Sequence, residues 1–171
     1  IMKNIDENTL FFCCDECMSC WKNREDLEKI TDQIDFVIHA GGLSTVWGRW
    51  EDFYNANVLG TQNVLDFCEK QNVKRLVFVS SPSVYAKKGD SLQVKEEEAP
   101  NENNLNFYIK SKILAENLIN KIDNQKLETV IIRPRGLFGI GDTSLVPRLI
   151  NANSKIGIPL FNDGKNIVDI T

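Results

Sequence analysis

The sequence predicts an α/β protein with a Rossmann-like, doubly wound parallel sheet, and three observations support that prediction. First, three short runs are almost continuously apolar, as strands covered on both faces are: residues 35–39, 75–80 and 129–133. Second, stretches with apolar residues at helical spacing separate these runs. Third, alternating strands and helices are typical of right-handed βαβ crossovers, which place helices on both sides of an open sheet.

The remaining elements are expected around those strands in chain order. Residues 10–14 are apolar enough for a further strand, and residues 23–30 have the charge pattern of a short amphipathic helix. Longer helices are expected at 50–70 and 106–122, where apolar side chains recur with a period near 3.6. A shorter helix is expected to begin at 145–151.

The composition is that of a globular protein. Of the 171 residues, 42% are hydrophobic and 26% are charged, which excludes a disordered chain or a collagen-like fibre. The net charge of -4 and the lack of a basic block argue against nucleic-acid binding. No apolar run approaches the roughly 18 residues that span a bilayer, and the first residues lack a secretory pattern. We therefore expect no membrane span and a cytoplasmic location.

The five cysteines allow two interpretations. Cys14, Cys17 and Cys20 have a spacing that could supply part of a metal or iron–sulfur site. A fourth ligand is missing nearby, because Cys68 falls in a predicted helix and His39, the only histidine, ends a predicted strand. The pattern favours reduced thiols and no metal, with a metal site as the alternative.

Tyr108 and Lys112 carry the most informative spacing. They lie four residues apart on a predicted helix, so they share one face. An ammonium close to a phenol favours the phenolate and lowers the phenol's pKa from its usual value near 10. Such a phenol can donate and accept protons at neutral pH. The alternative is a tyrosine at the edge of the core beside a solvated lysine.

Two strand ends add context to this pair. Ser81 follows the strand at 75–80, and a long polar segment, 87–104, separates it from the Tyr108 helix. Gly41 and Gly42 follow the strand at 35–39, where small residues permit a ligand to approach the backbone. Ligands of parallel sheets bind at the carboxyl ends of strands. Ordinary turns that terminate the strands are the alternative at both places.

Five segments, in order, resemble those of the extended short-chain dehydrogenase/reductase family, over about residues 21–171. They correspond to the strand that meets the nicotinamide, the NxxGTxN helix, the serine strand, the YxxSKxxAE signature and the RPxxxxG segment. In this chain they are residues 35–41, 57–63, 79–85, 108–116 and 133–139. Five ordered motifs are far more specific than any one of them.

The resemblance implies a role for particular residues. Tyr108 is expected to be the general acid/base, Lys112 to lower its pKa and bind the nicotinamide ribose, and Ser81 to hold the reacting oxygen of a small-molecule substrate. Asn57 is expected to be structural. The cofactor is expected to be NAD or NADP, and the sequence does not show which of the two is preferred. Besides Tyr108 and Lys112, the expected cofactor-binding positions are Ala40, Gly41, Gly42, Pro134 and Arg135.

The chain also departs from the family pattern. No GxxGxxG turn, which would place pyrophosphate at a helix N-terminus, is present in the sequence. We expect residues 1–150 to form a partial dinucleotide-binding domain and residues 151–171 to begin a substrate-binding lobe, both truncated from a longer enzyme. We expect this chain alone to bind dinucleotide weakly or not at all and to be inactive.

Within the family, the sequence favours oxidation or reduction of a secondary alcohol or ketone on a largely apolar substrate. Residues 41–48, with Trp47, resemble the 3β-hydroxysteroid dehydrogenase and β-hydroxy-acid reductase branch, and Gly136 stands where nucleotide-sugar enzymes usually carry Asn. The alternatives are a nucleotide-sugar epimerase or dehydratase and a non-catalytic fragment or scaffold module. The resemblance also implies a homodimer formed by the helices at 50–70 and 106–122.

Overall fold

The computed structural model describes residues 11–12, 34–45, 47–89, 91–137, 139–140, 145–160 and 162–165. The chain divides into two units, residues 1–133 and 134–171, and each is described by itself. The predicted helix at 23–30 and the cysteines at 13–20 lie outside the described residues, as does most of the predicted strand at 10–14.

The first unit contains a parallel sheet with the strand order β1-β2-β3-β4. All three neighbouring pairs are parallel, and β3 pairs with β4 from Arg75 opposite Glu128 to Val79 opposite Ile132. This confirms the fold class and places the three apolar runs in β2, β3 and β4, of which β4 is last in the strand order. The strands are β1 (Phe11–Phe12), β2 (Phe36–His39), β3 (Arg75–Val79) and β4 (Glu128–Ile132).

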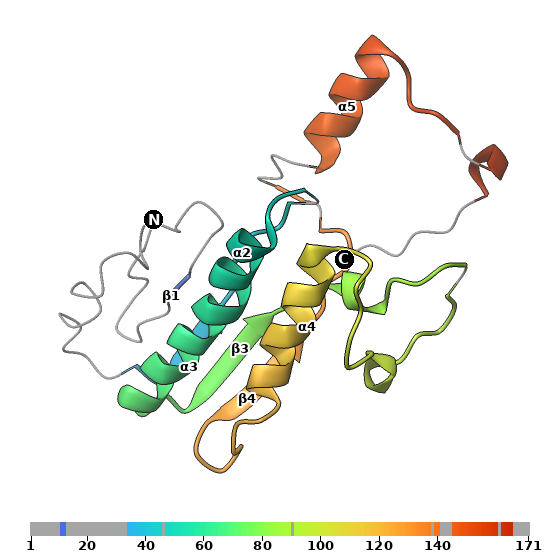
Figure 1. Cartoon of the computed structure of the whole chain (residues 1–171). Coiled ribbons are helices and arrows are strands. Elements are labelled where there is room, and N and C mark those ends of the chain that lie inside the picture. The colour runs from blue at the N-terminus through green and yellow to red at the C-terminus, as the bar shows by residue number, and fades with distance from the viewer. Residues whose placement is uncertain are drawn as a thin grey trace. The chain divides into compact units, whose positions relative to one another are not determined.

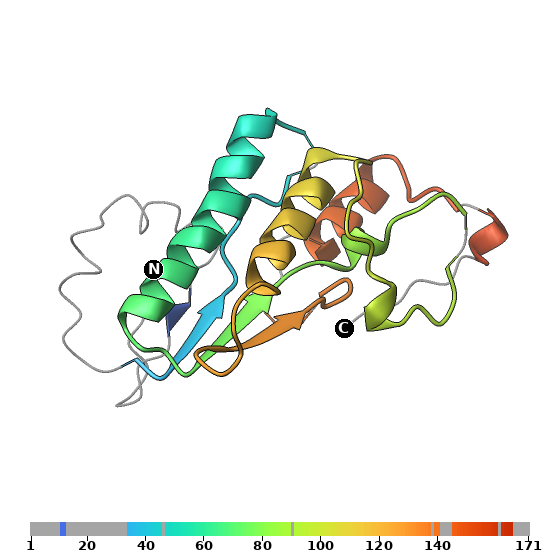
Figure 2. The ribbon, with the colours of Figure 1, turned by 60° about the horizontal axis from the view of Figure 1, so that its bottom comes forward.

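The helices of the first unit lie side by side on one face of this sheet (Figures 1 and 2). The expected helix at 50–70 is a continuous helical run of three parts: α2 (Trp50–Phe53), the π-helical η2 (Tyr54–Leu59) and α3 (Gly60–Lys70). The second helix is α4 (Phe107–Ile119), which begins where the Asn106 side chain accepts a hydrogen bond from the Ile109 N–H, 2.8 Å.

The main core lies between this helical layer and the sheet. Its α3 side consists of Val64, Leu65 and Cys68, which recur at helical spacing and face the strands. Burial raises the pKa of the Cys68 thiol to about 12, so this cysteine stays a neutral, apolar core residue. The other buried members of the core are Ile34, Val37, Val73, Leu76, Phe78, Ala115, Ile119 and Leu127.

Short 3₁₀ helices shape the connection between β3 and α4. The helix η3 (Pro82–Tyr85) follows β3 almost directly, and η4 (Glu96–Glu98) lies within the segment that the sequence predicts as a long polar loop. The Asn103 side chain donates to the carbonyls of Val84, 3.2 Å, and Ala86, 2.7 Å. The long loop is therefore fastened to the carboxyl end of the sheet.

The second unit contains α5 (Leu145–Lys155) and the 3₁₀ helix η5 (Asn162–Gly164). The start of α5 agrees with the helix expected at 145–151. Within the part of the chain that the structure describes, no helix combines the length and apolarity that crossing a membrane requires.

Candidate active site

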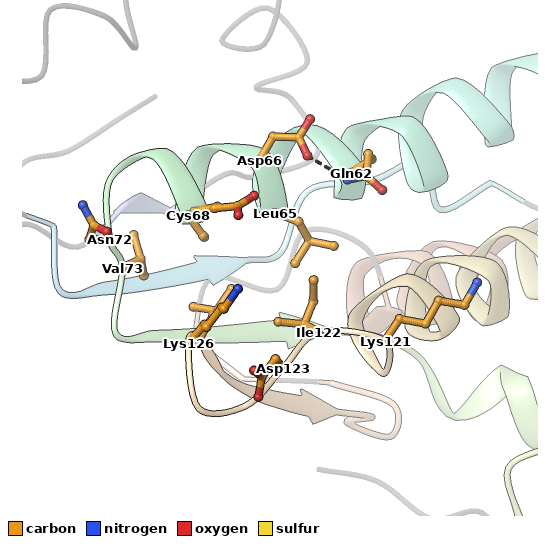
Figure 3. A pocket seen from close by; sticks show the side chains of 12 residues that line it. Gln62, Leu65, Asp66, Cys68, Asn72, Val73, Lys121, Ile122, Asp123 and Lys126 are labelled. Carbon is orange, nitrogen blue, oxygen red and sulfur yellow. Dashed lines mark hydrogen bonds between the residues drawn. The ribbon is translucent and has the colours of Figure 1, made fainter.

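A hollow of about 510 Å³ lies between the ends of α3 and α4 (Figure 3). Leu65, Val73 and Ile122 line it, and Asp66, Asp123 and other charged residues stand around them. Its volume suits a small molecule. However, its lining comes from α3 and from the turns that precede β3 and β4, near the amino-terminal ends of the strands. Ligands of parallel sheets bind at the opposite ends, so we place the candidate active site there.

Lys112 reaches the carboxyl end of β3 from α4. Its Nζ donates a hydrogen bond to the carbonyl of Val79, 3.0 Å, and lies 4.8 Å from the centroid of the Phe78 ring. Only 5% of the residue is exposed. The sequence alternative of a solvated lysine is therefore wrong. A buried ammonium at this place makes the strand end strongly electropositive.

Ser81 lies two residues after Val79 and caps η3. Its Oγ accepts from the Ser83 N–H, 3.2 Å, and donates to the Ser83 Oγ, 2.9 Å. These are the local hydroxyl bonds of a turn that terminates a strand. They orient the Ser81 hydroxyl at the carboxyl end of β3, and a substrate oxygen bound by Ser81 has to replace Ser83 as its partner.

Tyr108 lies on the first turn of α4, one turn before Lys112. Its side chain packs against a small cluster made by Val84 of η3 with Ile109 and Ile113 of α4. This cluster joins α4 to η3, the 3₁₀ turn that Ser81 caps. Lys112 and Ser81 thus lie at the carboxyl end of β3, and Tyr108 precedes Lys112 by one turn of α4.

The loop that follows β2 approaches the same place at Gly42, and Asn57 of η2 holds this loop. The buried Asn57 side chain accepts from the Leu43 N–H, 2.6 Å, and donates to the Leu43 carbonyl, 3.1 Å, and to the Ser111 Oγ, 2.8 Å. It therefore joins the loop after β2 to α4, which agrees with a structural role. Asn57 lies within the π-helical turn, a feature that often marks functional sites.

Gly42 is required by close packing. A Cβ on Gly42 would stand 2.7 Å from Asn57 Oδ1 and 3.6 Å from Lys112 Nζ. We expect Gly42→Ala to displace the Asn57 amide and to lower the free energy of unfolding by about 1–3 kcal/mol, measured by urea denaturation. Gly60→Ala is the matched control, because its Cβ would meet only the Asn55 carbonyl at 3.7 Å. Equal stability of the two variants would contradict this packing.

His39 ends β2 and is buried beside the same residues. The Thr61 hydroxyl donates to the Asn57 carbonyl, 2.7 Å, so His39 Nε2 donates to Thr61 Oγ1, 3.0 Å. Burial, and then the charge of Lys112, lower the pKa of His39 from 6.5 to about 3. The imidazole is therefore neutral at physiological pH and adds no second cation beside Lys112.

This depressed pKa predicts acid destabilisation. Below pH 6.5 the unfolded chain binds a proton at His39, whereas the folded chain does so only near pH 3. Stability should therefore fall between these values as the pH falls, with His39 contributing up to about 1.4 kcal/mol per pH unit. In urea unfolding at several pH values, His39→Gln, which can still donate to Thr61, should show a shallower fall. Identical slopes for both proteins would contradict the assignment.

A buried ionic network, which the sequence did not indicate, lies beside the catalytic junction. Arg133 follows β4 and binds Glu116 of α4 through two parallel bonds, Nε to Oε1 at 2.9 Å and Nη2 to Oε2 at 2.7 Å. Glu116 also accepts from the Ser80 hydroxyl. Arg133 Nη1 donates to the Tyr85 hydroxyl and to the Glu96 carbonyl, the latter at 3.3 Å.

The other predicted cofactor-binding residues lie in two places, after β2 and after β4. Ala40 and Gly41 continue β2 toward Gly42, and Gly41 is buried. Pro134 and Arg135 are the first two residues of the second unit, and both are partly buried. Their contact with a cofactor stays a prediction.

The sequence matches the 3-beta hydroxysteroid dehydrogenase/isomerase family over residues 2–171. The chain belongs to this family. It is 34% identical over 140 residues to the 2-alkyl-3-oxoalkanoate reductase of Stenotrophomonas maltophilia (strain K279a), and 33% identical over 165 residues to the sterol-4-alpha-carboxylate 3-dehydrogenase (decarboxylating) of Homo sapiens. These matches cover 81% and 94% of this chain but only 42% and 43% of the two relatives.

Solved structures of related proteins share the fold of this member of the 3-beta hydroxysteroid dehydrogenase/isomerase family. MoeE5 in complex with UDP-glucuronic acid and NAD is similar with a TM-score of 0.61 and 27% identity, covering 74% of this chain and 45% of that one. RMD from Pseudomonas aeruginosa, complexed with NADPH, has a TM-score of 0.62 and 26% identity, covering 71% and 44%.

Proposed function

We propose that the protein carrying this chain is an NAD(P)-dependent oxidoreductase that interconverts a ketone and a secondary alcohol on a largely apolar substrate. The observation that carries the proposal is the buried Lys112, which binds the Val79 carbonyl two residues before Ser81 and lies one turn of α4 after Tyr108. The names of the relatives support it, since a 2-alkyl-3-oxoalkanoate reductase and a sterol-4-alpha-carboxylate 3-dehydrogenase both act at carbon 3 of a hydrocarbon skeleton that carries a carboxylate.

The residues present fit the nicotinamide half of a dinucleotide. Lys112 offers ammonium N–H groups, from which ribose hydroxyls can accept hydrogen bonds. It lies beside Gly42, which has no side chain to block a ligand. Both are at the carboxyl ends of parallel strands, where dinucleotides bind. When bound, the cofactor donates or takes the hydride, and the protein supplies position and electric field.

In the direction of reduction, Tyr108 donates its phenolic proton to the carbonyl oxygen that becomes the alcohol. Ser81 donates a hydrogen bond to the same oxygen and polarises the carbonyl. Lys112 stabilises the phenolate that remains after proton transfer. Oxidation of the alcohol uses the same groups in reverse, with the Tyr108 phenolate as the base.

The test is a substrate comparison with the protein that carries this chain. Oxidation of NADH and of NADPH is measured with a 2-alkyl-3-oxoalkanoate and with a 3-oxosterol. Conversion of UDP-glucuronic acid is followed by product analysis in the presence of NAD, because an epimerase returns the hydride to its substrate and oxidises no NADH overall. We expect turnover of at least one apolar ketone, and loss of that turnover in Ser81→Ala by about 10²-fold or more, because the substrate oxygen loses a positioned donor.

A nucleotide-sugar epimerase or dehydratase is the second candidate. It is favoured by MoeE5 in complex with UDP-glucuronic acid and NAD, which shares the fold of this chain. Conversion of UDP-glucuronic acid, with no turnover of apolar ketones, would reverse the order of the two candidates. Absence of dinucleotide binding and of all turnover would favour the third candidate, a non-catalytic interaction module.

We also propose a homodimer that uses α2, η2 and α4. Trp50, Tyr54 and Phe107 form a partly exposed aromatic group there, with Trp50 5.7 Å from each of the other two rings, measured between ring centroids. Tyr54 and Phe107 are 37% and 46% exposed. A second copy would bury these rings. Sedimentation should show a dimer that Phe107→Glu dissociates, and a monomeric wild-type protein would refute the proposal.

A further inference from the structure

We propose that Glu116 and Arg133 are positioning residues that set the distance between Ser81 and Tyr108; this inference rests on the proposed function. The paired side chains are here called the Glu116–Arg133 clamp, and neither belongs to the predicted catalytic or cofactor-binding residues. They join the helix that carries Tyr108 to the strand end that carries Ser81.

On the strand side, the clamp acts on the residue beside Ser81. The Ser80 hydroxyl donates to Glu116, and the Ser80 N–H donates to the Ile132 carbonyl of β4, 2.8 Å. Ser80 is thus held from two directions, by α4 and by β4. Because Ser81 is the next residue, its hydroxyl cannot move away from α4 without breaking one of these bonds.

On the helix side, the clamp adds a second fixed point one turn beyond Lys112. Lys112 binds the carbonyl of Val79 and Glu116 binds the hydroxyl of Ser80. Two bonds from successive turns of α4 to consecutive residues of one strand end prevent the helix from sliding or rotating. Tyr108, one turn before Lys112 on the same helix, is positioned by the same two bonds.

Arg133 adds a third set of bonds, besides those on the strand side and on the helix side. Its two parallel bonds to Glu116 hold the carboxylate in one plane, which a lysine cannot do. Its third nitrogen reaches the Tyr85 hydroxyl and the Glu96 carbonyl, and its guanidinium carbon lies 5.2 Å from the Tyr85 ring centroid. The arginine therefore also holds η3, which Ser81 caps, and the loop that follows it.

Because the clamp is largely buried, we infer that it fixes the geometry of the site rather than adding to the stability of the fold. The side chains of Arg133 and Glu116 are 16% and 5% exposed. A buried ion pair is often no more stabilising than an apolar replacement, because both charges lose their hydration. Its bonds are directional, however, and a displacement of about 1 Å at a reacting centre can cost about 10²-fold in rate.

The chain provides a matched control pair. Arg75 of β3 and Glu128 of β4 form another arginine–glutamate pair, with Arg75 Nη2 2.8 Å from Glu128 Oε2, at the amino-terminal ends of these strands. Their side chains are 45% and 54% exposed. Arg75→Met also removes an arginine–carboxylate pair, but at the end of β3 far from Ser81.

The experiment compares Glu116→Gln, Arg133→Lys, Arg133→Met and Arg75→Met in the protein that carries this chain. Ketone turnover is measured well below each thermal midpoint, together with the Kd for the dinucleotide. We expect kcat to fall by about 10- to 100-fold in Arg133→Met and Glu116→Gln, less in Arg133→Lys, and not in Arg75→Met. The Kd should stay within about threefold, because the clamp does not contact the cofactor.

Rescue separates positioning from a loss of folded protein. Low millimolar guanidinium chloride should restore part of kcat in Arg133→Ala, whereas ammonium chloride should not. Only guanidinium reproduces the two parallel N–H donors of the arginine side chain. If Arg133→Met does not fold, Glu116→Gln and Arg133→Lys decide the question. Lower thermal midpoints with wild-type kcat would overturn the clamp as a positioning device. A wild-type protein without oxidoreductase activity would instead refute the proposed function, and the clamp's catalytic role with it.

Discussion

Tyr108→Phe should abolish most of the ketone reductase activity while leaving the fold and dinucleotide binding intact. The substitution removes only the phenolic oxygen, and the ring can still pack against Val84, Ile109 and Ile113. Loss of a positioned general acid typically costs about 10²- to 10⁴-fold in rate. We therefore expect kcat to fall by that factor, measured by steady-state oxidation of the reduced dinucleotide.

Tyr54→Phe is the matched control for this variant. Tyr54 lies in the π-helical turn, where its ring contacts Trp50, and it is partly exposed. Its hydroxyl has no place in the proposed reaction, so kcat should not change. A Tyr108→Phe protein that keeps more than a tenth of wild-type kcat would remove the phenol from the mechanism.

Lys112→Met should give the second large loss, because it removes the only charge that the account places beside the phenol. The methionine can fill much of the same space, so the fold should survive, although the Val79 carbonyl loses its donor. Leaving a buried carbonyl without this partner costs about 1–3 kcal/mol. We expect kcat to fall by about 10²- to 10⁴-fold and the KM for dinucleotide to rise, since both proposed roles are lost.

His39 provides an independent readout of the same substitution. It is the only histidine in the sequence, so its imidazole resonances can be followed by NMR. Lys112 is the second cause of its depressed pKa, after burial. In Lys112→Met the pKa of His39 should rise but stay below 6.5, and in the control Lys110→Met, whose ammonium lies over the Trp50 ring, it should not change. An unshifted pKa in Lys112→Met would contradict the site geometry.

Three strands could be predicted from the sequence because their runs are almost continuously apolar, although Phe36 of β2 and Ile132 of β4 are 46% and 41% exposed. The runs at 35–39, 75–80 and 129–133 match β2, β3 and β4 to within a residue at each end. The helix at 50–70 was predicted as a whole, but its π-helical part was not. A single π turn hardly changes the spacing of apolar residues, so a period near 3.6 cannot reveal that Asn57 lies in one.

The candidate site was predictable where its residues are neighbours in sequence and not where they meet only in space. The spacing of Tyr108 and Lys112 already places them on one helical face. The bond from Lys112 to Val79 and the pair of Glu116 with Arg133 depend on how α4 packs on the sheet. Both members of that pair fall in the matched motifs, yet nothing in either motif states that they contact each other.

Deuterium transfer from the dinucleotide to the substrate is the decisive measurement for the proposed reduction of an apolar ketone. The protein that carries this chain is incubated with an apolar 3-oxo substrate and with dinucleotide deuterated at the transferable position of the reduced nicotinamide ring. We predict one deuterium at the new carbinol carbon of the wild-type product, and formation of that product about 10²- to 10⁴-fold more slowly in Tyr108→Phe. An apolar alcohol without deuterium, or no apolar alcohol at all, would contradict the proposed function.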